Sequence, residues 1–231
     1  MGKLIVLEAC DGAGKSTQLE LIKNYIKEKG LSFSFFHFPM YGHNEFSDMI
    51  AKYLRGEYGN IDEVSPYFVA FIYAMDRSKF LPELQKELDE KDIVLLDRYV
   101  YSNIAYQGAK LGEEIEDWIY DFEFNFLKLP YPDLNLFFDV PIKILEQRLK
   151  QDEVRSDREY LQGKQDIHEA DLSFQEKVRN EFIAVSKNKN FKIIKTVFSS
   201  GTMMNPSVII LSPYGLFQSY KKYIDKIIKK L

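Results

Sequence analysis

Short apolar segments alternate along the chain with longer segments in which apolar residues recur at helical spacing. This alternation is typical of a parallel sheet whose successive strands are joined by helices. We expect strands at Leu4–Leu7, Phe33–His37, Ile93–Leu96, Leu134–Phe138 and Ile193–Val197. We expect helices near 15–29, 44–55, 65–90, 99–109, 114–128, 141–150, 170–188 and 213–231. The pattern therefore predicts an α/β fold, with a five-stranded parallel sheet flanked by helices.

Acidic residues follow three of the expected strands directly. They are Glu8, Asp97 and Asp139. Because the carboxyl ends of parallel strands meet at one edge of a sheet, these side chains should gather where ligands bind in open α/β folds. The sequence thus predicts a ligand site at this edge.

Two segments depart from the regular alternation. The helix expected at 65–90 is apolar over more than one face, which indicates that it is central or that half of it faces a second subunit. In the segment 199–231, whose role is uncertain, Ser207–Leu211 predicts a further strand beside Ile193–Val197. Because no Gly/Pro-rich linker or repeat divides the chain, we expect a single domain over 1–231.

Composition narrows the class of protein. The 231 residues carry a net charge of −4, which argues against a general nucleic-acid-binding surface. The single cysteine, Cys10, excludes an internal disulfide and suits a reducing compartment. No segment reads as a membrane span or a targeting signal. We therefore expect a cytoplasmic protein that binds neither nucleic acid nor membrane.

The first loop carries the strongest chemical signal. It lies between an expected strand and an expected helix, and its residues are Ala9, Cys10, Asp11, Gly12, Ala13, Gly14, Lys15, Ser16 and Thr17. The glycines let successive backbone N–H groups point at phosphate oxygens, and the helix adds the positive end of its dipole. Lys15 can reach the outer phosphates, and the Ser16 hydroxyl can complete a Mg²⁺ shell. This is the phosphate-binding arrangement of P-loop proteins, so the whole loop is predicted to bind ATP.

A second cluster follows the third expected strand. Asp97 ends that strand, the position from which a carboxylate orients Mg²⁺ directly or through water. Arg98 suits a phosphate, which its planar guanidinium can bind at two points. On the next expected helix, Ser102 and Gln107 can present a donor and an acceptor to a base edge, and Tyr106 a flat apolar wall. Taken alone, Ser102 and Gln107 are more often structural.

Several motifs are spread over residues 4–196 and are specific when taken together. They are Glu8–Thr17, Phe38-Pro39 with Tyr41-Gly42, Tyr73–Arg77, Asp97–Gln107, Pro132-Asp133, Asp139–Pro141, Asp166–Glu169 and Phe174–Arg179. In these motifs the sequence resembles the thymidylate kinases, a family of P-loop nucleoside monophosphate kinases. The resemblance implies the P-loop NTPase/nucleoside monophosphate kinase fold, with a lid at about 148–166. It also implies a homodimer that transfers the γ-phosphoryl group of Mg-ATP to dTMP, giving dTDP and ADP for dTTP synthesis.

Roles of individual residues can be carried over from the resemblance. Lys15 and the loop amides would hold the ATP phosphates, with Ser16 and Asp97 on Mg²⁺. Arg98 would bind the acceptor phosphate and neutralise charge during transfer, assisted by lid arginines. The arginines in the lid region are Arg148, expected at ATP, and Arg155 and Arg158, expected in catalysis. The residues expected around dTMP are Asp11 at the 3′-hydroxyl, Tyr73 stacked on thymine, Arg77, Ser102 and Gln107 at the base edge, and Phe38, Pro39, Arg98 and Tyr106.

Departures from the family pattern keep alternatives open. Relatives carry an arginine after the Phe-Pro pair, where this chain has Met40-Tyr41, so one contact to the monophosphate is missing or is supplied elsewhere. The end of the lid has Ile167-His168 where many relatives have an arginine, and Ala9 stands in place of glycine. A kinase for another nucleoside monophosphate or a deoxynucleoside, and a nucleotide-binding homologue without turnover, remain alternatives.

Overall fold

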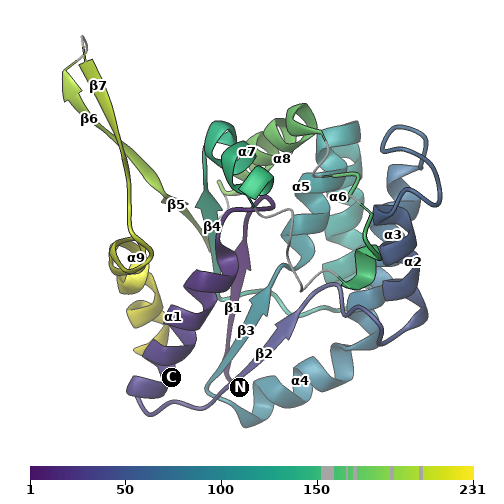
Figure 1. Ribbon diagram of the computed structural model, residues 1–231. Coiled ribbons are helices and arrows are strands. Elements are labelled where there is room, and N and C mark those ends of the chain that lie inside the picture. Colours follow the sequence, from purple (N-terminus) through teal and green to yellow (C-terminus); the bar gives the residue numbers. More distant parts are fainter. Residues whose placement is uncertain (152–158, 165, 169–170, 188–189, 203–204) are drawn as a thin grey trace.

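The computed structural model describes residues 1–151, 159–164, 166–168, 171–187, 190–202 and 205–231. Its centre is a five-stranded sheet in the order β2-β3-β1-β4-β5 (Figure 1). The strands are β1 (Lys3–Glu8), β2 (Phe33–His37), β3 (Ile93–Asp97), β4 (Leu134–Asp139) and β5 (Phe191–Lys195). All neighbouring strands pair in parallel, so the predicted α/β architecture is confirmed.

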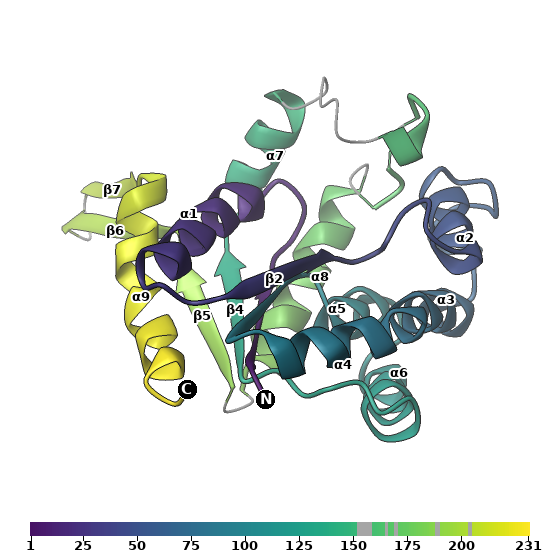
Figure 2. The ribbon, with the colours of Figure 1, turned by 90° about the horizontal axis from the view of Figure 1, so that it is seen from below.

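Helices cover both faces of this sheet. Those in the described residues are α1 (Lys15–Glu28), α2 (Glu45–Leu54), α3 (Pro66–Lys79), α4 (Leu81–Glu90), α5 (Val100–Leu111), α6 (Glu113–Tyr120), α7 (Ile142–Gln151), α8 (Leu172–Val185) and α9 (Pro213–Ile228). α1 packs with α9 on one face, and α5 packs with α8 on the other (Figure 2). None of these helices, in the part of the chain that the structure describes, has the length and hydrophobicity that a membrane crossing needs.

Burial on both faces explains the unbroken apolar runs of the central strands. Every residue of β3 and β4 is buried, as are Leu4–Glu8 of β1. A strand covered by helices on both sides has no solvent-facing positions to alternate with the apolar ones. The register sets Asp97 beside Leu7 and Phe137 beside Glu8, so the carboxyl ends of these strands form one edge.

The prediction of one helix over 65–90 is wrong. α3 ends at Lys79, and α4 begins at Leu81. Pro82 has no amide hydrogen to continue the ladder of α3, and its ring crowds the preceding turn. The new helix starts instead with the Leu84 N–H donating to the Phe80 carbonyl. The break leaves α3 against α2 and α5 while α4 reaches β3.

The prediction of one α-helix over 114–128 is also wrong in its second half. α6 ends at Tyr120 and is followed by a π-helical segment, η1 (Asp121–Phe126). The Leu127 N–H donates to the Phe122 carbonyl at 2.9 Å, the five-residue spacing of a π-helix. The wider turn brings Glu123 into the interior with none of its surface exposed.

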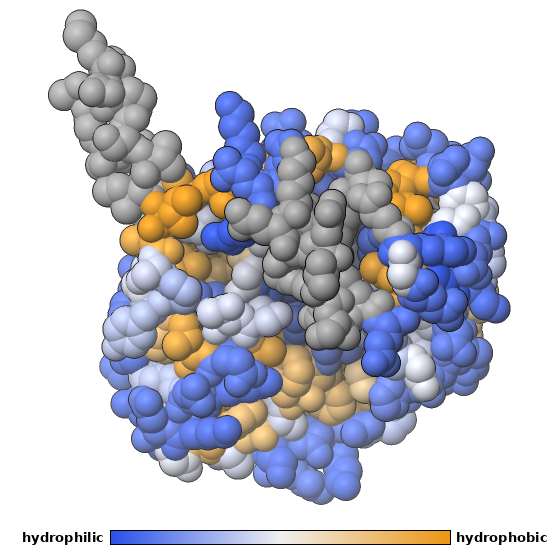
Figure 3. All heavy atoms as spheres, in the orientation of Figure 1, coloured by the Kyte–Doolittle hydropathy of each residue, from blue (hydrophilic) through white to orange (hydrophobic). Residues whose placement is uncertain are grey.

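The strand predicted at Ser207–Leu211 exists but does not pair with the main sheet. It lies in β7 (Asn205–Ile210), which pairs antiparallel with β6 (Val197–Thr202) to form a separate ribbon. Thr196 connects the ribbon to the main sheet. Its N–H donates to the Asp139 carbonyl at the end of β4, and its carbonyl accepts from the Leu211 N–H after β7. The ribbon projects from the body, and hydrophobic residues gather where it leaves (Figures 1 and 3).

The C-terminal helix is part of the core. The Tyr220 hydroxyl donates to Gln18 Oε1 at 2.8 Å, and Gln18 Nε2 donates to the Pro213 carbonyl at 3.1 Å. Ile224 is fully buried in the same layer. α9 therefore supports α1 directly behind the first loop.

Candidate functional site

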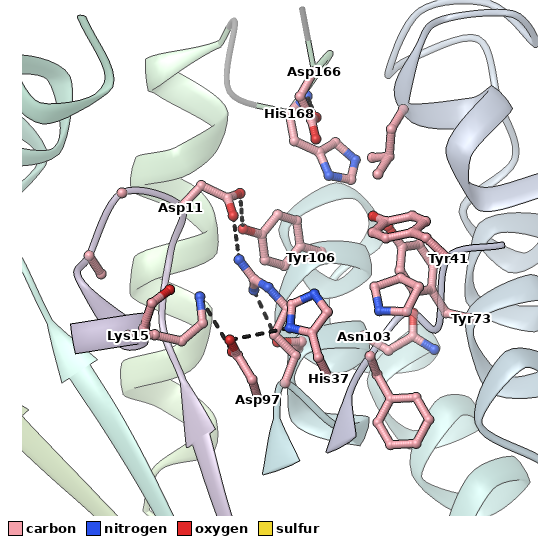
Figure 4. A pocket seen from close by; sticks show the side chains of 18 of the residues that line it. Asp11, Lys15, His37, Tyr41, Tyr73, Asp97, Asn103, Tyr106, Asp166 and His168 are labelled. Atoms are coloured by element: carbon pink, nitrogen blue, oxygen red, sulfur yellow. Dashed lines mark hydrogen bonds and ion pairs between the residues drawn. The ribbon is translucent and has the colours of Figure 1, made fainter. Parts of the chain in front are cut away.

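A cavity of about 330 Å³ opens at the carboxyl edge of the sheet. The residues that line it come from the first loop, the ends of β2 and β3, helices α3 and α5, and the segment after α7 (Figure 4). All of the residues predicted for the acceptor lie on its wall: Asp11, Phe38, Pro39, Tyr73, Arg77, Arg98, Ser102, Tyr106 and Gln107. The structure thus brings together side chains that are up to 96 positions apart in the sequence.

The first loop has the backbone expected of an anion cradle. Gly12 and Gly14 have φ of 73° and 84°, the left-handed region that favours glycine. α1 begins directly afterwards at Lys15, and Ser16 and Thr17 line the cavity at its first turn. Burial and the charge of Arg98 lower the pKa of Lys15. An anionic ligand at this place would meet backbone N–H groups, a helix N-terminus and a lysine together.

Arg98 lies at the centre of the site. Its φ of 65° is unusual for a residue with a side chain, and strain of this kind is typical of functional positions. Its guanidinium donates to the Ala9 carbonyl at 3.0 Å and to Ser102 Oγ at 3.2 Å, and it forms an ion pair with Asp11. Desolvation of the half-buried Asp11 raises its pKa, but the charges of Arg98 and Lys15 outweigh this and hold it well below the usual range.

The donors near Asp97 fit a Mg²⁺ ion. Asp97 Oδ1 is buried and has no hydrogen-bond partner within the described ranges, although Lys15 Nζ lies 3.8 Å away. Burial raises the pKa of Asp97, but Lys15 and a hydrogen bond from His37 outweigh this and hold it at about 2. An ionised carboxylate oxygen without a hydrogen-bond partner and the hydroxyl-bearing Ser16 line the same cavity, and such oxygens are the donors that Mg²⁺ prefers.

Glu8 is a site residue whose role the sequence analysis missed. It is fully buried and accepts hydrogen bonds from the Tyr99 N–H at 3.0 Å and from the Ser102 hydroxyl. Burial raises the pKa of Glu8 to about 7, although the Ser102 hydrogen bond opposes the shift. Ser102 lines the cavity, but its hydroxyl hydrogen is directed at Glu8 here, so its role as a donor to a base edge stays a prediction.

The end of the cavity away from the loop carries amides and aromatic rings. Both polar atoms of the Gln107 side chain are buried without a hydrogen-bond partner among the residues described. Asn103, which the sequence analysis also missed, lines the same wall, and its Oδ1 is likewise unpaired there. The sequence feature that could have indicated Asn103 is its amide side chain, one position after Ser102 on a buried helix. Unpaired buried amides usually indicate a missing polar ligand.

The segment that follows α7 covers this end of the cavity. The ring of Tyr160, in the 3₁₀ turn η2 (Glu159–Leu161), stacks on Tyr41 with a centroid distance of 3.9 Å and an interplanar angle of 4°. His168 lines the cavity, and its Nε2 lies 2.9 Å from the Tyr53 hydroxyl. Tyr160, within the predicted lid, therefore lines the cavity where the acceptor is expected.

His168 should make the stability of the fold sensitive to acid. It is only 4% exposed, and burial together with the charge of Lys110 lowers its pKa from 6.5 to about 3. Between these values the unfolded chain binds a proton that the folded chain does not, so stability present above pH 6.5 is lost as pH falls toward 3. His168→Gln should remove this contribution, roughly 3–5 kcal/mol over the whole interval.

Urea denaturation between about pH 7 and about pH 4 measures this effect. The free energy of unfolding of His168→Gln should fall less steeply with decreasing pH than that of the unmodified protein. If the free energy of unfolding fell equally steeply with decreasing pH in both proteins, His168 would take up its proton in the folded state as readily as in the unfolded state.

A second cavity of about 280 Å³ lies on the other side of the first loop. The loop and α1 form one wall, and the other is built from Arg148, Thr196, Leu211, Pro213 and Leu216. Arg148, predicted at ATP, is on α7 with Nη1 3.3 Å from the Ala13 carbonyl. Arg155 and Arg158, predicted in catalysis, lie outside the described residues.

Comparison with known proteins agrees with this geometry. The family model described as thymidylate kinase matches residues 7–205. A thymidylate kinase of Caldicellulosiruptor saccharolyticus is 31% identical over 231 residues, covering 99% of this chain and 98% of the relative. One of Mycobacterium tuberculosis is 36% identical over 149 residues, covering 63% and 69%. The solved thymidylate kinase of Candida albicans superposes with a TM-score of 0.67 at 22% identity, covering 97% and 92%, which supports the fold.

Proposed function

The chain belongs to the thymidylate kinase family, and we propose that it transfers the γ-phosphoryl group of Mg-ATP to dTMP, giving dTDP and ADP. One observation carries the proposal beyond family membership. Lys15 and Arg98 come from separate loops and both line the cavity, between the phosphate cradle and a wall of unpaired amides. Two anionic nucleotides can therefore meet there with their phosphates facing each other.

The residues of the chain act by alignment and charge neutralisation. ATP phosphates would lie against the loop amides and Lys15, and the acceptor phosphate against Arg98. In the transfer, a dTMP phosphate oxygen bonds to the γ-phosphorus as the bond to the β–γ bridging oxygen breaks, and Arg98 would neutralise the transferring group. Mg²⁺, held by Ser16 and Asp97, would neutralise charge on the phosphates. Asp11, held by Arg98 and Tyr106, would accept a hydrogen bond from the 3′-hydroxyl.

The two cavities suggest how the nucleotides are oriented. We propose that the adenine of ATP occupies the second cavity, because the first loop separates that cavity from the acceptor site. Arg148 is positioned to pack against the adenine ring from α7. Thymine would lie at the opposite end, between Tyr73 and the amides of Asn103 and Gln107. This orientation places the reacting phosphates at Lys15 and Arg98.

A coupled assay of ADP release tests the activity. Purified protein with Mg-ATP should turn over dTMP faster than dUMP, thymidine or the other nucleoside monophosphates. Preference for thymidine or for a different monophosphate would support a kinase with another acceptor. Binding of ATP and dTMP without release of ADP would support a homologue without turnover.

Met40→Arg should strengthen dTMP binding. Family members carry an arginine at this place, whereas here the Met40 N–H donates to Asp76 at 3.1 Å and its side chain provides no charge. A restored charge-assisted contact to the phosphate is worth about 1.5–3 kcal/mol, so the KM for dTMP should fall about tenfold or more with little change in kcat. His43→Arg adds the same charge at a nearby exposed position and is the control. An unchanged KM in Met40→Arg would show that other groups already hold the phosphate.

We also propose that the protein is a homodimer, joined through an aromatic row on α2, α3 and η1. The row is Phe46, Phe71, Phe122 and Phe126, with successive ring centroids 6.3, 6.0 and 5.5 Å apart. Phe71 is 39% exposed and Phe126 72%, which is costly unless a second copy covers them. The position of the row on α3 agrees with the broad apolar surface predicted for residues 65–90.

Charge placed in the aromatic row should dissociate the dimer. In sedimentation equilibrium, Phe71→Asp should have the mass of one chain and the unmodified protein that of two. Tyr214→Asp, at an exposed aromatic residue on α9, should remain dimeric. A monomeric unmodified protein at micromolar concentration would contradict the proposal.

We also propose a location for the enzyme. Its single cysteine suits a reducing compartment, so we place it in the cytoplasm.

A further inference from the structure

The π-helical segment η1 buries a carboxylate behind the wall of the acceptor cavity. Glu123 is fully buried and does not line the cavity, so it cannot touch a ligand there. Its side chain contacts two residues that do line the cavity, Arg77 on α3 and Asn103 on α5. Glu123 is therefore placed to act on a bound nucleotide through these two neighbours.

The contacts with Arg77 fix the plane of its guanidinium. Nε and Nη2 of Arg77 each donate to a different carboxylate oxygen of Glu123, both at 2.6 Å. This bidentate geometry holds the group in one orientation. Nη1 is the remaining donor atom of the same guanidinium, and Arg77 reaches the cavity wall although only 2% of it is exposed. The wall is thus provided with an oriented hydrogen-bond donor.

The contacts with Asn103 fix which end of its amide faces the ligand. Nδ2 donates one hydrogen to Glu123 Oε1 at 2.9 Å and the other to the Ala70 carbonyl at 3.0 Å. A carboxylate paired with arginine only accepts hydrogen bonds, so the amide cannot turn its oxygen toward Glu123. Oδ1 therefore points the other way, where it is buried and unpaired in the structure as described. The wall is thus provided with an oriented acceptor as well.

We propose that Glu123 is a positioning residue that sets the pyrimidine selectivity of the enzyme by orienting Asn103 and Arg77. This inference rests on the proposed dTMP kinase activity. An acceptor beside a donor complements the N3–H and O4 of thymine or uracil. Cytosine presents the reverse pattern, an N3 acceptor beside an N4 amino donor. With cytosine, the N3 acceptor would face the buried Asn103 Oδ1, also an acceptor, and the N4 donor would face the buried Arg77 guanidinium, also a donor. Such mismatches give strong discrimination between substrates.

Glu123→Gln tests the proposal while keeping the size of the side chain. A glutamine amide can donate as well as accept, so the Asn103 amide loses one of the two acceptors that fix its orientation and keeps only the Ala70 carbonyl. We expect the ratio of kcat/KM for dTMP to that for dCMP to fall at least about tenfold, because the dTMP value falls while the dCMP value stays or rises. Asp121→Asn makes the same chemical change at an exposed position of η1 and should leave the ratio unchanged.

The outcomes separate this inference from the proposed activity and from a purely structural role. If Glu123→Gln lowered kcat/KM for dTMP and for dCMP by the same factor, so that their ratio was preserved, the proposal would be overturned. If that variant does not fold, Glu123→Asp replaces it, since it keeps the charge beside Arg77 but shortens the reach to Asn103, and it must also lower the ratio. An unmodified protein that does not phosphorylate dTMP would contradict the proposed activity itself.

Discussion

Arg98→Ala is expected to lower kcat by on the order of 10³–10⁵, the effect of removing an arginine that neutralises a transferring phosphoryl group. Arg98 contacts Asp11, Ala9 and Ser102 together, so it is held at the centre of the cavity before substrate arrives. Asp97, the residue before it at the end of β3, is anionic and cannot replace it. Steady-state kinetics with saturating Mg-ATP and dTMP measures the loss.

Arg98→Gly separates the side chain of this residue from its backbone. At a φ of 65° a glycine is unstrained, whereas an alanine keeps the clash of its Cβ with the backbone. The glycine variant should therefore be more stable to urea than the alanine variant by about 1 kcal/mol, with the same loss of kcat. Retention of more than about a tenth of kcat in both variants would be incompatible with the role given to Arg98.

Lys15→Met is expected to lower kcat/KM for ATP by on the order of 10²–10³, the cost of removing one preorganised electrostatic contact from a buried site. Its ammonium group lies at the first turn of α1, 3.8 Å from Asp97, where the phosphates of ATP would meet the loop amides. Methionine keeps most of the length of the side chain and removes the charge together with its hydrogen-bond donors. Initial rates over a range of ATP concentrations measure the effect.

Lys23→Met is the matched control for this variant. Lys23 is also on α1, but it pairs with Glu20 at 2.8 Å and lines neither cavity. Its loss should leave kcat/KM for ATP unchanged within about twofold, because an exposed ion pair contributes little. Thermal denaturation of both variants checks that they fold. A normal kcat/KM for ATP in Lys15→Met would mean that the loop amides alone bind the phosphates.

Local sequence pattern was enough for the central sheet and the phosphate loop. β1, β3 and β4 contain the apolar runs Leu4–Leu7, Ile93–Leu96 and Leu136–Phe138 because helices cover both faces of the sheet, and these runs make the strands visible in the sequence. The loop depends on the conformational freedom of Gly12 and Gly14 and on the helix that begins at Lys15, all adjacent in sequence. The wrong predictions were also local. A new helix begins around Pro82 within 65–90, and the helix type changes at η1 within 114–128.

The sequence by itself determined which chemical groups are available: the loop lysine, the acid and arginine after β3, and the amides of α5. Tertiary structure alone decided what each group is free to do. The Ser102 hydroxyl donates to Glu8, and Glu123 holds Arg77 and one end of Asn103. Among the described residues of the cavity wall, Gln107, Asn103 Oδ1 and Asp97 Oδ1 are left without a hydrogen-bond partner. The physical reason is that these hydrogen bonds join residues 20 to 94 positions apart in the chain. The spacing of residues in the sequence does not indicate which donor will pair with which acceptor.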